Sequence, residues 1–355
     1  MSRSKVEMLK KEQVIMHIGL HKTGTTSIQQ FLAENRTQLG DLDYVCYTRD
    51  GFFREDGNSY FLLKQHNWYS NKRSCQFDMP LLMENIKNSN KSRVMISSEA
   101  FSWCTGIENI KKLKDELLTV TDEILILVYV RDPVSFAVSV YTEGLKYPNS
   151  LSVLTDYTYP CLSKNNLCSQ LSIEHYTFAN LLPWKEVFLD NLKVRCLEDD
   201  KLFQNNLLAD VLHVIGLNGN DKLKVKALSY RRENESFNML QVYYLTLVIK
   251  FFNKFKDSHR LKSLSYELIR HKIHWLKSDK KFSVNDDVAK NYIDEIRNEL
   301  FFSKERLGEN INSEYYRGSN RLKRFSALDI IKIFFIFSVH VFLFGRYSLN
   351  RFLNK

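Results

Sequence analysis

The sequence predicts an α/β fold in three layers, with a central, mainly parallel sheet flanked by helices and with further helices near the C-terminus. Two continuous apolar runs, residues 14–18 and 124–130, are typical of strands buried inside a parallel sheet. Each run leads through a short polar turn into a helical pattern. After the first run, Ile28, Phe31 and Leu32 recur at i, i+3 and i+4. Strands that alternate with helices in this way indicate the α/β class.

The turn after the first strand, residues 19–26, has the composition of a phosphate-binding loop. Gly19 and Gly24 let backbone N–H groups approach an anion, and the start of the next helix offers unpaired N–H groups and a favourable dipole. The side chains available there for binding are those of Lys22, Thr23, Thr25 and Thr26. A nucleotide P-loop places its lysine after the second glycine, whereas here Lys22 precedes Gly24 and Thr25 takes the lysine's usual place. The pattern therefore predicts a P-loop-like fold and disfavours ordinary ATP or GTP hydrolysis.

The strand at residues 124–130 ends in a second polar motif. Asp132 is a suitable N-cap and Pro133 suits the first position of the helix that follows. Arg131 is then expected at the carboxyl edge of the sheet, where open α/β sheets bind ligands, and Ser139 follows in the second turn of the helix. A guanidinium and a hydroxyl can both donate hydrogen bonds to a phosphate. The alternative is that Arg131 and Asp132 form a surface ion pair at the helix start.

The two motifs resemble those of sulfotransferases that use 3′-phosphoadenosine 5′-phosphosulfate (PAPS). Residues 20–32, LHKTGTTSIQQFL, resemble the family's 5′-phosphosulfate loop. Residues 131–141, RDPVSFAVSVY, resemble its 3′-phosphate signature, an arginine followed eight residues later by a serine. The resemblance implies that the loop holds the 5′-phosphate, that Lys22 acts on the transferred group, and that Arg131 and Ser139 hold the 3′-phosphate.

Two side chains are candidates for the base that sulfuryl transfer to a hydroxyl requires. Glu99 follows a short apolar strand at residues 94–96, and the resemblance to the glycan-modifying branch of the family implies a glutamate here as the base. The alternatives for Glu99 are a helix cap or a partner for a lysine. His21 in the phosphate loop is the rival base, while His17 inside the first strand is expected to be a satisfied core histidine.

A third segment, residues 231–236, resembles the part of related enzymes that closes over the nucleotide. Its pattern has low specificity, and its binding candidates are Arg231, Asn234 and Ser236. The six cysteines lack zinc-site spacing, and the acidic residues 198–200 suit the dipole of a helix start better than a metal. The sequence therefore predicts no metal site.

Charge and length suggest one catalytic domain over residues 1–310 and a basic, apolar tail over residues 311–355. Residues 315–355 hold eight basic residues and one acidic residue, so seven of the ten net positive charges lie there. This placement, together with the lack of a recognised motif, argues against nucleic-acid binding. Within the tail, residues 330–344 are almost entirely apolar, but they fall short of the ~20 residues that span a bilayer.

We expect residues 330–344 to lie in the interface of a membrane, with the flanking bases on anionic headgroups. The alternative is a helix packed in a groove of the catalytic domain. The polar first residues resemble neither a signal peptide nor an N-terminal anchor, which predicts a cytoplasmic protein that is peripheral on the inner membrane.

The predicted function is that of an enzyme, a PAPS-dependent sulfotransferase acting on a hydroxyl of a saccharide or glycolipid. PAPS is the expected donor co-substrate, and the expected acceptor pocket is built from the irregular residues 50–80 and 147–168. Two other classes stay open: a nucleotide-dependent kinase with an aberrant P-loop, and a non-catalytic module that binds PAPS.

Overall fold

Five parallel strands form the central sheet. The computed structural model describes residues 10–64, 75–145, 173–230, 237–253, 276, 278, 282, 284, 286–307, 331–335 and 338. The strands are β1 (Gln13–His17), β2 (Leu42–Tyr44), β3 (Arg93–Ser97), β4 (Ile124–Val130) and β5 (Leu192–Cys196). They stand in the order β2-β3-β1-β4-β5, and every neighbouring pair is parallel. The predicted α/β class with a central parallel sheet is therefore confirmed.

Helices follow the strands along the chain. The α-helices are α1 (Thr25–Glu34), α2 (Met79–Asn88), α3 (Ile107–Leu118), α4 (Pro133–Gly144), α5 (Ile173–Tyr176), α6 (Leu182–Phe188), α7 (Leu207–Val214), α8 (Asp221–Ser229), α9 (Met239–Asn253) and α11 (Asp286–Leu307). Short 3₁₀ helices include η2 (Tyr60–Leu62), η3 (Glu99–Trp103) and η9 (Phe203–Asn205). The predicted helices after the first and fourth strands are thus present as α1 and α4.

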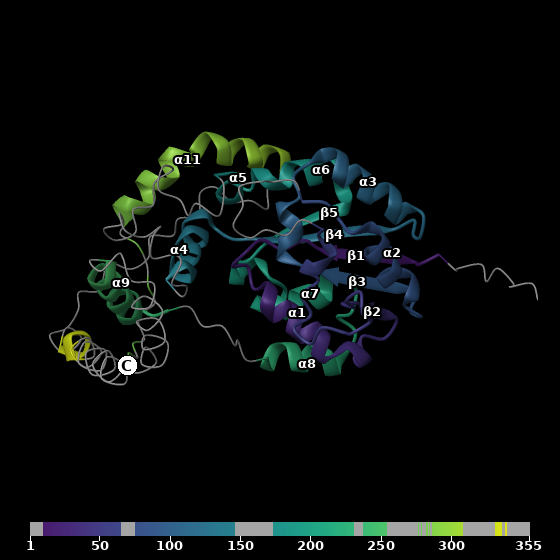
Figure 1. Cartoon of the computed structure of the whole chain (residues 1–355), viewed down its shortest axis with the longest axis horizontal. Coiled ribbons are helices and arrows are strands. Elements are labelled where there is room, and N and C mark those ends of the chain that lie inside the picture. Colours follow the sequence, from purple (N-terminus) through teal and green to yellow (C-terminus); the bar gives the residue numbers. More distant parts are fainter. Residues whose placement is uncertain are drawn as a thin grey trace, which may run out of the picture. The chain divides into compact units, whose positions relative to one another are not determined.

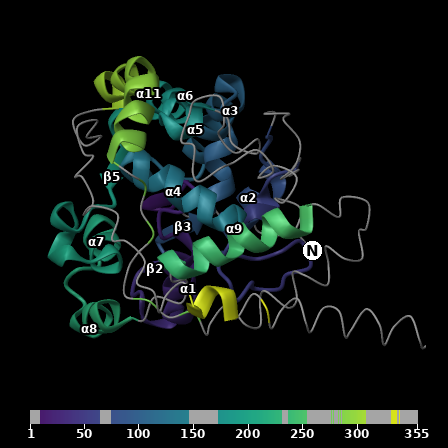
Figure 2. The same ribbon diagram turned by 90° about the vertical axis from the view of Figure 1, so that its left-hand side faces the viewer.

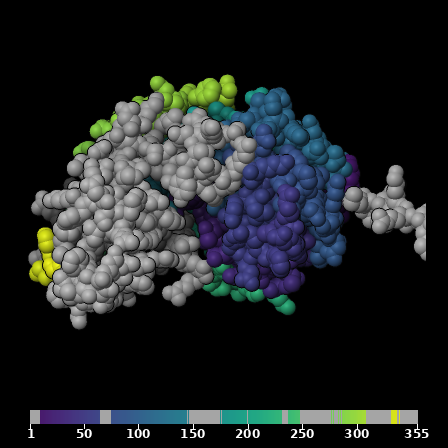
Figure 3. Space-filling model, viewed as in Figure 1, coloured from purple at the N-terminus to yellow at the C-terminus, as the bar shows by residue number. Residues whose placement is uncertain are grey.

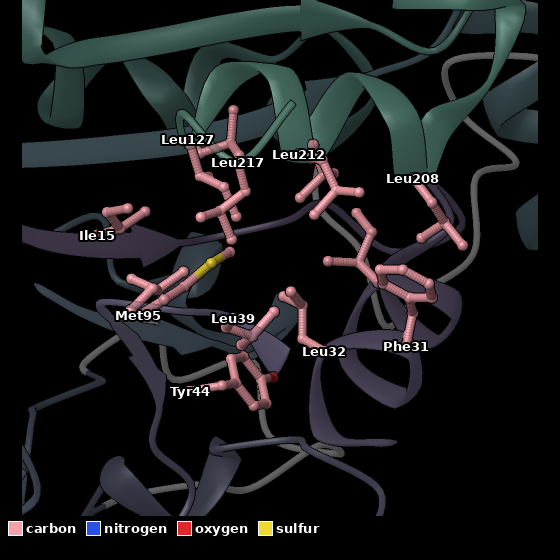
Figure 4. Packing of buried hydrophobic residues seen from close by; sticks show 14 of the residues in the cluster. Ile15, Phe31, Leu32, Leu39, Tyr44, Met95, Leu127, Leu208, Leu212 and Leu217 are labelled. Carbon is pink, nitrogen blue, oxygen red and sulfur yellow. The ribbon is translucent and has the colours of Figure 1, made fainter. Parts of the chain in front are cut away.

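Both faces of the sheet are covered, as a buried parallel sheet requires. Helices α1, α7 and α8 lie on one face, and α2, α3 and α6 lie on the other (Figure 1). In the first of these layers, Phe31 and Leu32 of α1 pack with Leu208 and Leu212 of α7 (Figure 4). All seven residues of β4 are buried, which explains its continuous apolar sequence.

Strand β1 occupies the middle of the sheet, between β3 and β4. His17 is paired with Ser97 of β3 on one side and with Leu127 of β4 on the other. From β1 the chain continues toward β2, whereas from β4 it continues toward β5 at the opposite edge. The boundary between β1 and β4 is therefore a topological switch point, the place where open α/β sheets bind ligands beyond the carboxyl ends of their strands.

A buried carboxylate ties β4 and β5 to α7. Asp210 of α7 is completely buried and accepts hydrogen bonds from Tyr129 Oη at 2.7 Å, Arg195 Nε at 3.0 Å and the Phe203 backbone N–H at 2.8 Å. Burial and the neighbouring Asp210 carboxylate together raise the pKa of Tyr129 well above its usual value. Because removing one member would leave a buried charge without its partner, this network fixes the position of α7 on the sheet.

The chain divides into two compact units. The first unit contains the sheet and comprises Met1–Pro133, Gln170–Glu233 and Ile296–Tyr315. In Figure 3, the side of this unit that faces the viewer is largely formed by N-terminal segments, coloured purple and blue. The second comprises Val134–Ser169, Asn234–Glu295 and Tyr316–Lys355. The predicted division into residues 1–310 and 311–355 stays a prediction.

Helix α9, drawn along its length in Figure 2, belongs to the second unit. The Tyr141 hydroxyl of α4 lies 3.4 Å from Thr246 Oγ1 of α9, and the Tyr141 ring stacks on Phe282 with 6.0 Å between the ring centroids. These contacts join α4 to α9 within the second unit.

Candidate functional site

The loop between β1 and α1 contains two residues with positive φ, in the segment where the sequence predicts phosphate binding. Lys22 and Gly24 adopt left-handed conformations, with φ of 64° and 81°, on either side of Thr23. Gly24 is the N-cap of α1, so no side chain caps the helix, and the first turn contains no acidic residue. Turns that combine left-handed residues with free N–H groups form concave anion sites. A lysine with positive φ is uncommon, and such strain is typical of functional turns.

Glycine stands at both ends of this loop, where a side chain would crowd its neighbours. A Cβ atom on Gly24 would overlap the side chain of Leu207, the first residue of α7. A Cβ atom on Gly19 would lie 3.0 Å from Thr25 Oγ1 and 3.1 Å from the ring of His17. The loop is therefore pressed between α7 and the end of β1.

Two of the predicted phosphate-binding threonines hold the loop together from inside. Thr23 Oγ1 donates to the Leu20 carbonyl at 2.7 Å, and Thr25 Oγ1 donates to the same carbonyl at 3.1 Å. Both residues are buried, and each hydroxyl has one proton to donate. Thr26, in contrast, is exposed in the first turn of α1. Among the three threonines, Thr26 is thus the one whose side chain faces solvent.

Glu99 is the second residue after β3 and the first residue of η3. Its Oε2 accepts a hydrogen bond from Gln29 Nε2 at 3.1 Å, and Asn58 Nδ2 lies 3.1 Å from each of its two carboxylate oxygens. The helix η3 is capped by Ser98, whose Oγ accepts from the Ala100 N–H, and not by Glu99. Within the described residues Glu99 forms no ion pair, so neither alternative role, cap or lysine partner, is found there. Neutral amides hold the carboxylate without neutralising it.

His21 packs against the helix that carries Glu99. Its ring centroid lies 5.1 Å from that of Trp103, the last residue of η3, with the two planes at 56°. The contact joins the phosphate loop to η3. Its role as the rival base stays a prediction.

His17 is fully buried beneath the loop. Its Nδ1 lies 2.8 Å from Ser97 Oγ, which also accepts a hydrogen bond from Gln29 Nε2 at 3.3 Å. Its Nε2 has no hydrogen-bond partner among the described residues, so the expected satisfied core histidine is satisfied at one nitrogen. Burial lowers the pKa of His17 to about 3, which keeps the ring neutral. The chain His17–Ser97–Gln29–Glu99 therefore connects the ends of β1 and β3 without a buried cation.

Arg131 is half-buried and directly follows β4, and Pro133 begins α4 as predicted. Ser139 is buried on α4, in the part of that helix that belongs to the second unit. The pairing of Arg131 with Ser139 on one phosphate stays a prediction. The candidates Arg231, Asn234 and Ser236 lie outside the described residues.

Gln29 and Asn58 are the members of this site that sequence reasoning missed. Gln29 lies on the stripe of α1 formed by residues 25, 28, 29 and 32, which are all buried, and a polar side chain on such a stripe is a usable signal. Asn58 lies in an irregular segment whose sequence has no periodicity. Its contact with Glu99 joins residues 41 positions apart and could not be recognised locally.

No group of three or more His, Cys, Asp or Glu side chains within the described ranges could hold a metal ion. Comparison of the chain with protein-family models, with curated proteins and with solved structures finds no match. The functional argument therefore depends on the motifs and on the site geometry.

The neutrality of buried His17 predicts a specific loss of stability in acid. The unfolded chain binds a proton at His17 near the ordinary value of 6.5, while the folded protein binds one only near pH 3. The contribution of neutral His17 to the free energy of unfolding is fully present above pH ~6.5. It falls by ~1.4 kcal/mol per pH unit as the pH drops toward 3. Urea unfolding of the wild type and of His17→Gln between pH 7.5 and 4.5 measures it, and the difference between the two is expected to shrink on acidification.

A His213→Gln variant, at an exposed position on α7, is the control for replacing a histidine by glutamine. A constant difference between wild type and His17→Gln at every pH would show that His17 is not held neutral by the fold.

Proposed function

We propose that the chain is an enzyme, a PAPS-dependent sulfotransferase that acts on a hydroxyl of a saccharide or glycolipid. One observation carries the proposal: the phosphate loop, Glu99 and Arg131 follow three adjacent parallel strands, β1, β3 and β4. Their backbones therefore reach the same edge of the sheet, beside the switch point. The turn with its lysine suits the 5′-phosphosulfate of PAPS, and the guanidinium suits the separate 3′-phosphate. The carboxylate, held by neutral hydrogen-bond donors, suits a base for the acceptor hydroxyl.

In the proposed complex, the backbone N–H groups of residues 23–26 and the Thr26 hydroxyl hold the 5′-phosphate. Thr23 and Thr25 keep the loop in shape through the Leu20 carbonyl. Arg131 donates charge-assisted hydrogen bonds to the 3′-phosphate, and Ser139 adds a hydroxyl donor. The second-rank candidates Arg231, Asn234 and Ser236 complete the nucleotide site.

The reaction is a displacement at sulfur. The acceptor oxygen forms a bond to the sulfur while the bond from sulfur to the bridging phosphate oxygen breaks, and its electron pair goes to the departing 3′-phosphoadenosine 5′-phosphate (PAP). Lys22 and the dipole of α1 stabilise the charge on that oxygen, and Glu99 takes the proton of the acceptor hydroxyl. Since Lys22 and the dipole of α1 supply the positive charge, the proposed mechanism uses no metal.

The donor assignment predicts that PAP stabilises the folded protein without Mg²⁺. A ligand that binds only the native state at 100 times its Kd adds ~2.7 kcal/mol to the free energy of unfolding, so PAP is expected to raise Tm clearly. ATP lacks the 3′-phosphate and is expected to raise Tm much less. Thermal denaturation with PAP or ATP, each with and without Mg²⁺, is the measurement. Equal stabilisation by ATP in a Mg²⁺-dependent manner would instead support the kinase.

The proposed roles of Arg131 and Glu99 predict different losses. Arg131→Ala removes charge-assisted hydrogen bonds and is expected to weaken PAP binding by ~2–3 kcal/mol. Glu99→Gln keeps the shape of the side chain and is expected to lower turnover by ~10²-fold or more, with PAP affinity almost unchanged. Calorimetric titration with PAP and transfer of labelled sulfuryl groups to a total glycan and lipid extract separate the two effects. Full turnover by Glu99→Gln would redirect the search for the base to His21. Binding of PAPS without transfer to any acceptor would favour the non-catalytic module.

We further propose a cytoplasmic enzyme that is peripheral on the inner membrane through residues 330–344. In the described helical residues 331–335, the side chains of Ile331, Phe334 and Phe335 are at least 60 % exposed. Apolar side chains beside basic residues suit an interface with anionic lipids. None of the helices in the described ranges combines the length and apolar character needed to cross a bilayer.

The tail proposal predicts that truncation after Gly318 abolishes sedimentation with anionic vesicles while the Tm of the remaining chain is unchanged. Neutral vesicles are the control for the electrostatic contribution. Equal sedimentation of the full-length and truncated proteins would rule out the anchor. A truncated protein that unfolds would show that the segment packs on the catalytic domain.

A further inference from the structure

The Glu99 carboxylate is held by a loop that precedes β3 in the sequence. This loop, residues 54–60, contacts the end of β3 at two points. The Ser59 N–H donates to the Ser97 carbonyl at 2.9 Å, and Ser98 Oγ donates to Asn58 Oδ1 at 2.9 Å. The loop lies within residues 50–80, where the sequence predicts part of the acceptor pocket.

Hydrogen bonds fix which way the Asn58 amide points. Its Oδ1 accepts from the Tyr60 backbone N–H at 3.2 Å as well as from Ser98 Oγ. A backbone N–H can only donate, so the atom that faces Tyr60 must be the oxygen. The Nδ2 group must then face Glu99, where it lies 3.1 Å from both carboxylate oxygens.

Gly57 sets the position of Asn58. Its φ is 68°, and a Cβ atom there would lie 2.6 Å from the Gln29 carbonyl oxygen in the backbone of α1. The Tyr44 hydroxyl donates to the Gly57 carbonyl and holds the loop from the other side. Because backbone atoms of a helix cannot move aside as a side chain can, only glycine permits this close approach.

The amides of Gln29 and Asn58 donate unequal numbers of hydrogen bonds to the two Glu99 carboxylate oxygens. Gln29 donates to Oε2 alone, while Asn58 reaches both oxygens, so Oε2 has two donors and Oε1 has one. A carboxylate oxygen can accept two hydrogen bonds, so Oε1 keeps a free lone pair among its described contacts.

We propose that Asn58 is the positioning residue of the base, and that it leaves Glu99 Oε1 as the oxygen that takes the acceptor's proton. This inference rests on the proposed function for its catalytic part. Gly57 allows Asn58 to lie close to α1, and Asn58 orients the Glu99 carboxylate. Gln29 donates a hydrogen bond to Oε2, the other oxygen of that carboxylate. The loop that carries Asn58 thereby joins the expected acceptor side to the base.

The contact is tested first without any activity. In an NMR spectrum of the whole chain, Glu99→Gln is expected to shift the side-chain amide resonances of Asn58. The same substitution is expected to leave those of Asn85 unchanged, because Asn85 donates to the carbonyls of Tyr47 and Leu81. Asn58 resonances that do not respond would overturn the proposal whatever the protein catalyses.

The positioning role is then tested with PAPS as the donor and a total glycan and lipid extract as the acceptor. Asn58→Asp has the same shape but replaces the donor with a second carboxylate, and we expect kcat to fall by ~10²-fold because the reacting groups are misplaced. The acid side of the pH profile is expected to move to higher pH, since two neighbouring carboxylates cannot both ionise easily. PAP affinity is expected to stay within about twofold, because the described hydrogen bonds of Asn58 go to Asp56, Tyr60, Ser98 and Glu99 and to no residue of the phosphate loop. Asn90→Asp is the matched control, because Asn90 is exposed in the turn before β3, at the end of that strand opposite to Glu99, and it is expected to change neither kcat nor the profile.

A pair of glycine variants provides a second test of the positioning role in case Asn58→Asp does not fold. Gly57→Ala and Gly51→Ala both place alanine at a positive φ, 68° and 77°, but a Cβ atom on Gly51 meets nothing within 4 Å. We expect Gly57→Ala to lose ~10-fold in kcat and Gly51→Ala to lose less than about twofold, because only the first pushes Asn58 away from Glu99.

Equal kcat values for the two glycine variants, or a wild-type kcat and pH profile for Asn58→Asp, would overturn the positioning role and leave the sulfotransferase proposal standing. A wild type that neither binds PAP nor transfers sulfuryl groups would overturn the proposed function and, with it, the catalytic part of this inference.

Discussion

The pairing of β1 with β3 on one side and β4 on the other is the constraint on which the candidate site depends. The Ser98 N–H donates to the His17 carbonyl at 3.0 Å, and the Ile18 N–H donates to the Leu127 carbonyl at 2.9 Å. A slip of one residue in either ladder would turn every side chain of a strand to the opposite face, and both faces are covered by helices. The packing of both faces against the helices therefore fixes the register, and the register brings the three polar loops to one edge.

Polar groups beneath this edge follow a second constraint, the high cost of burying a charge. His17 and Ser97 are fully buried, and Gln29 is almost so. All three are neutral, and the first negative charge in the chain of contacts, at Glu99, appears where burial is only partial. This series of neutral hydrogen-bonded side chains joins the end of β1 to the Glu99 carboxylate at a lower free-energy cost than a buried ion pair would, since buried ion pairs often fail to repay their desolvation. His17 Nε2, next to Gly19, has no hydrogen-bond partner in the part of the chain that the structure describes, and such local costs are typical of functional sites.

The sequence predicts the elements around the site better than their assembly. The bounds of β4 match the apolar run at residues 124–130, and α4 begins at Pro133, because continuous burial and capping leave strong local signals. Strand β2 has three residues, too few for a period, and was not predicted. Lys22, Glu99 and Arg131 are identifiable because each lies within five residues of the end of a strand. Asn58 and Gln29 are not, because their importance comes from contacts with a residue 41 or 70 positions away.

The arrangement of cations distinguishes the proposed donor from a nucleoside triphosphate. In a triphosphate the phosphates are contiguous, and a P-loop lysine after the second glycine reaches along them. Here Lys22 precedes Gly24, both residues have positive φ, and the hydroxyls of Thr23 and Thr25 donate to the Leu20 carbonyl within the loop. The second cation, Arg131, follows β4 on the other side of the switch point. Two cations attached to different strands suit two separate phosphate groups, as on the 5′ and 3′ positions of one nucleotide, better than one continuous chain of phosphates.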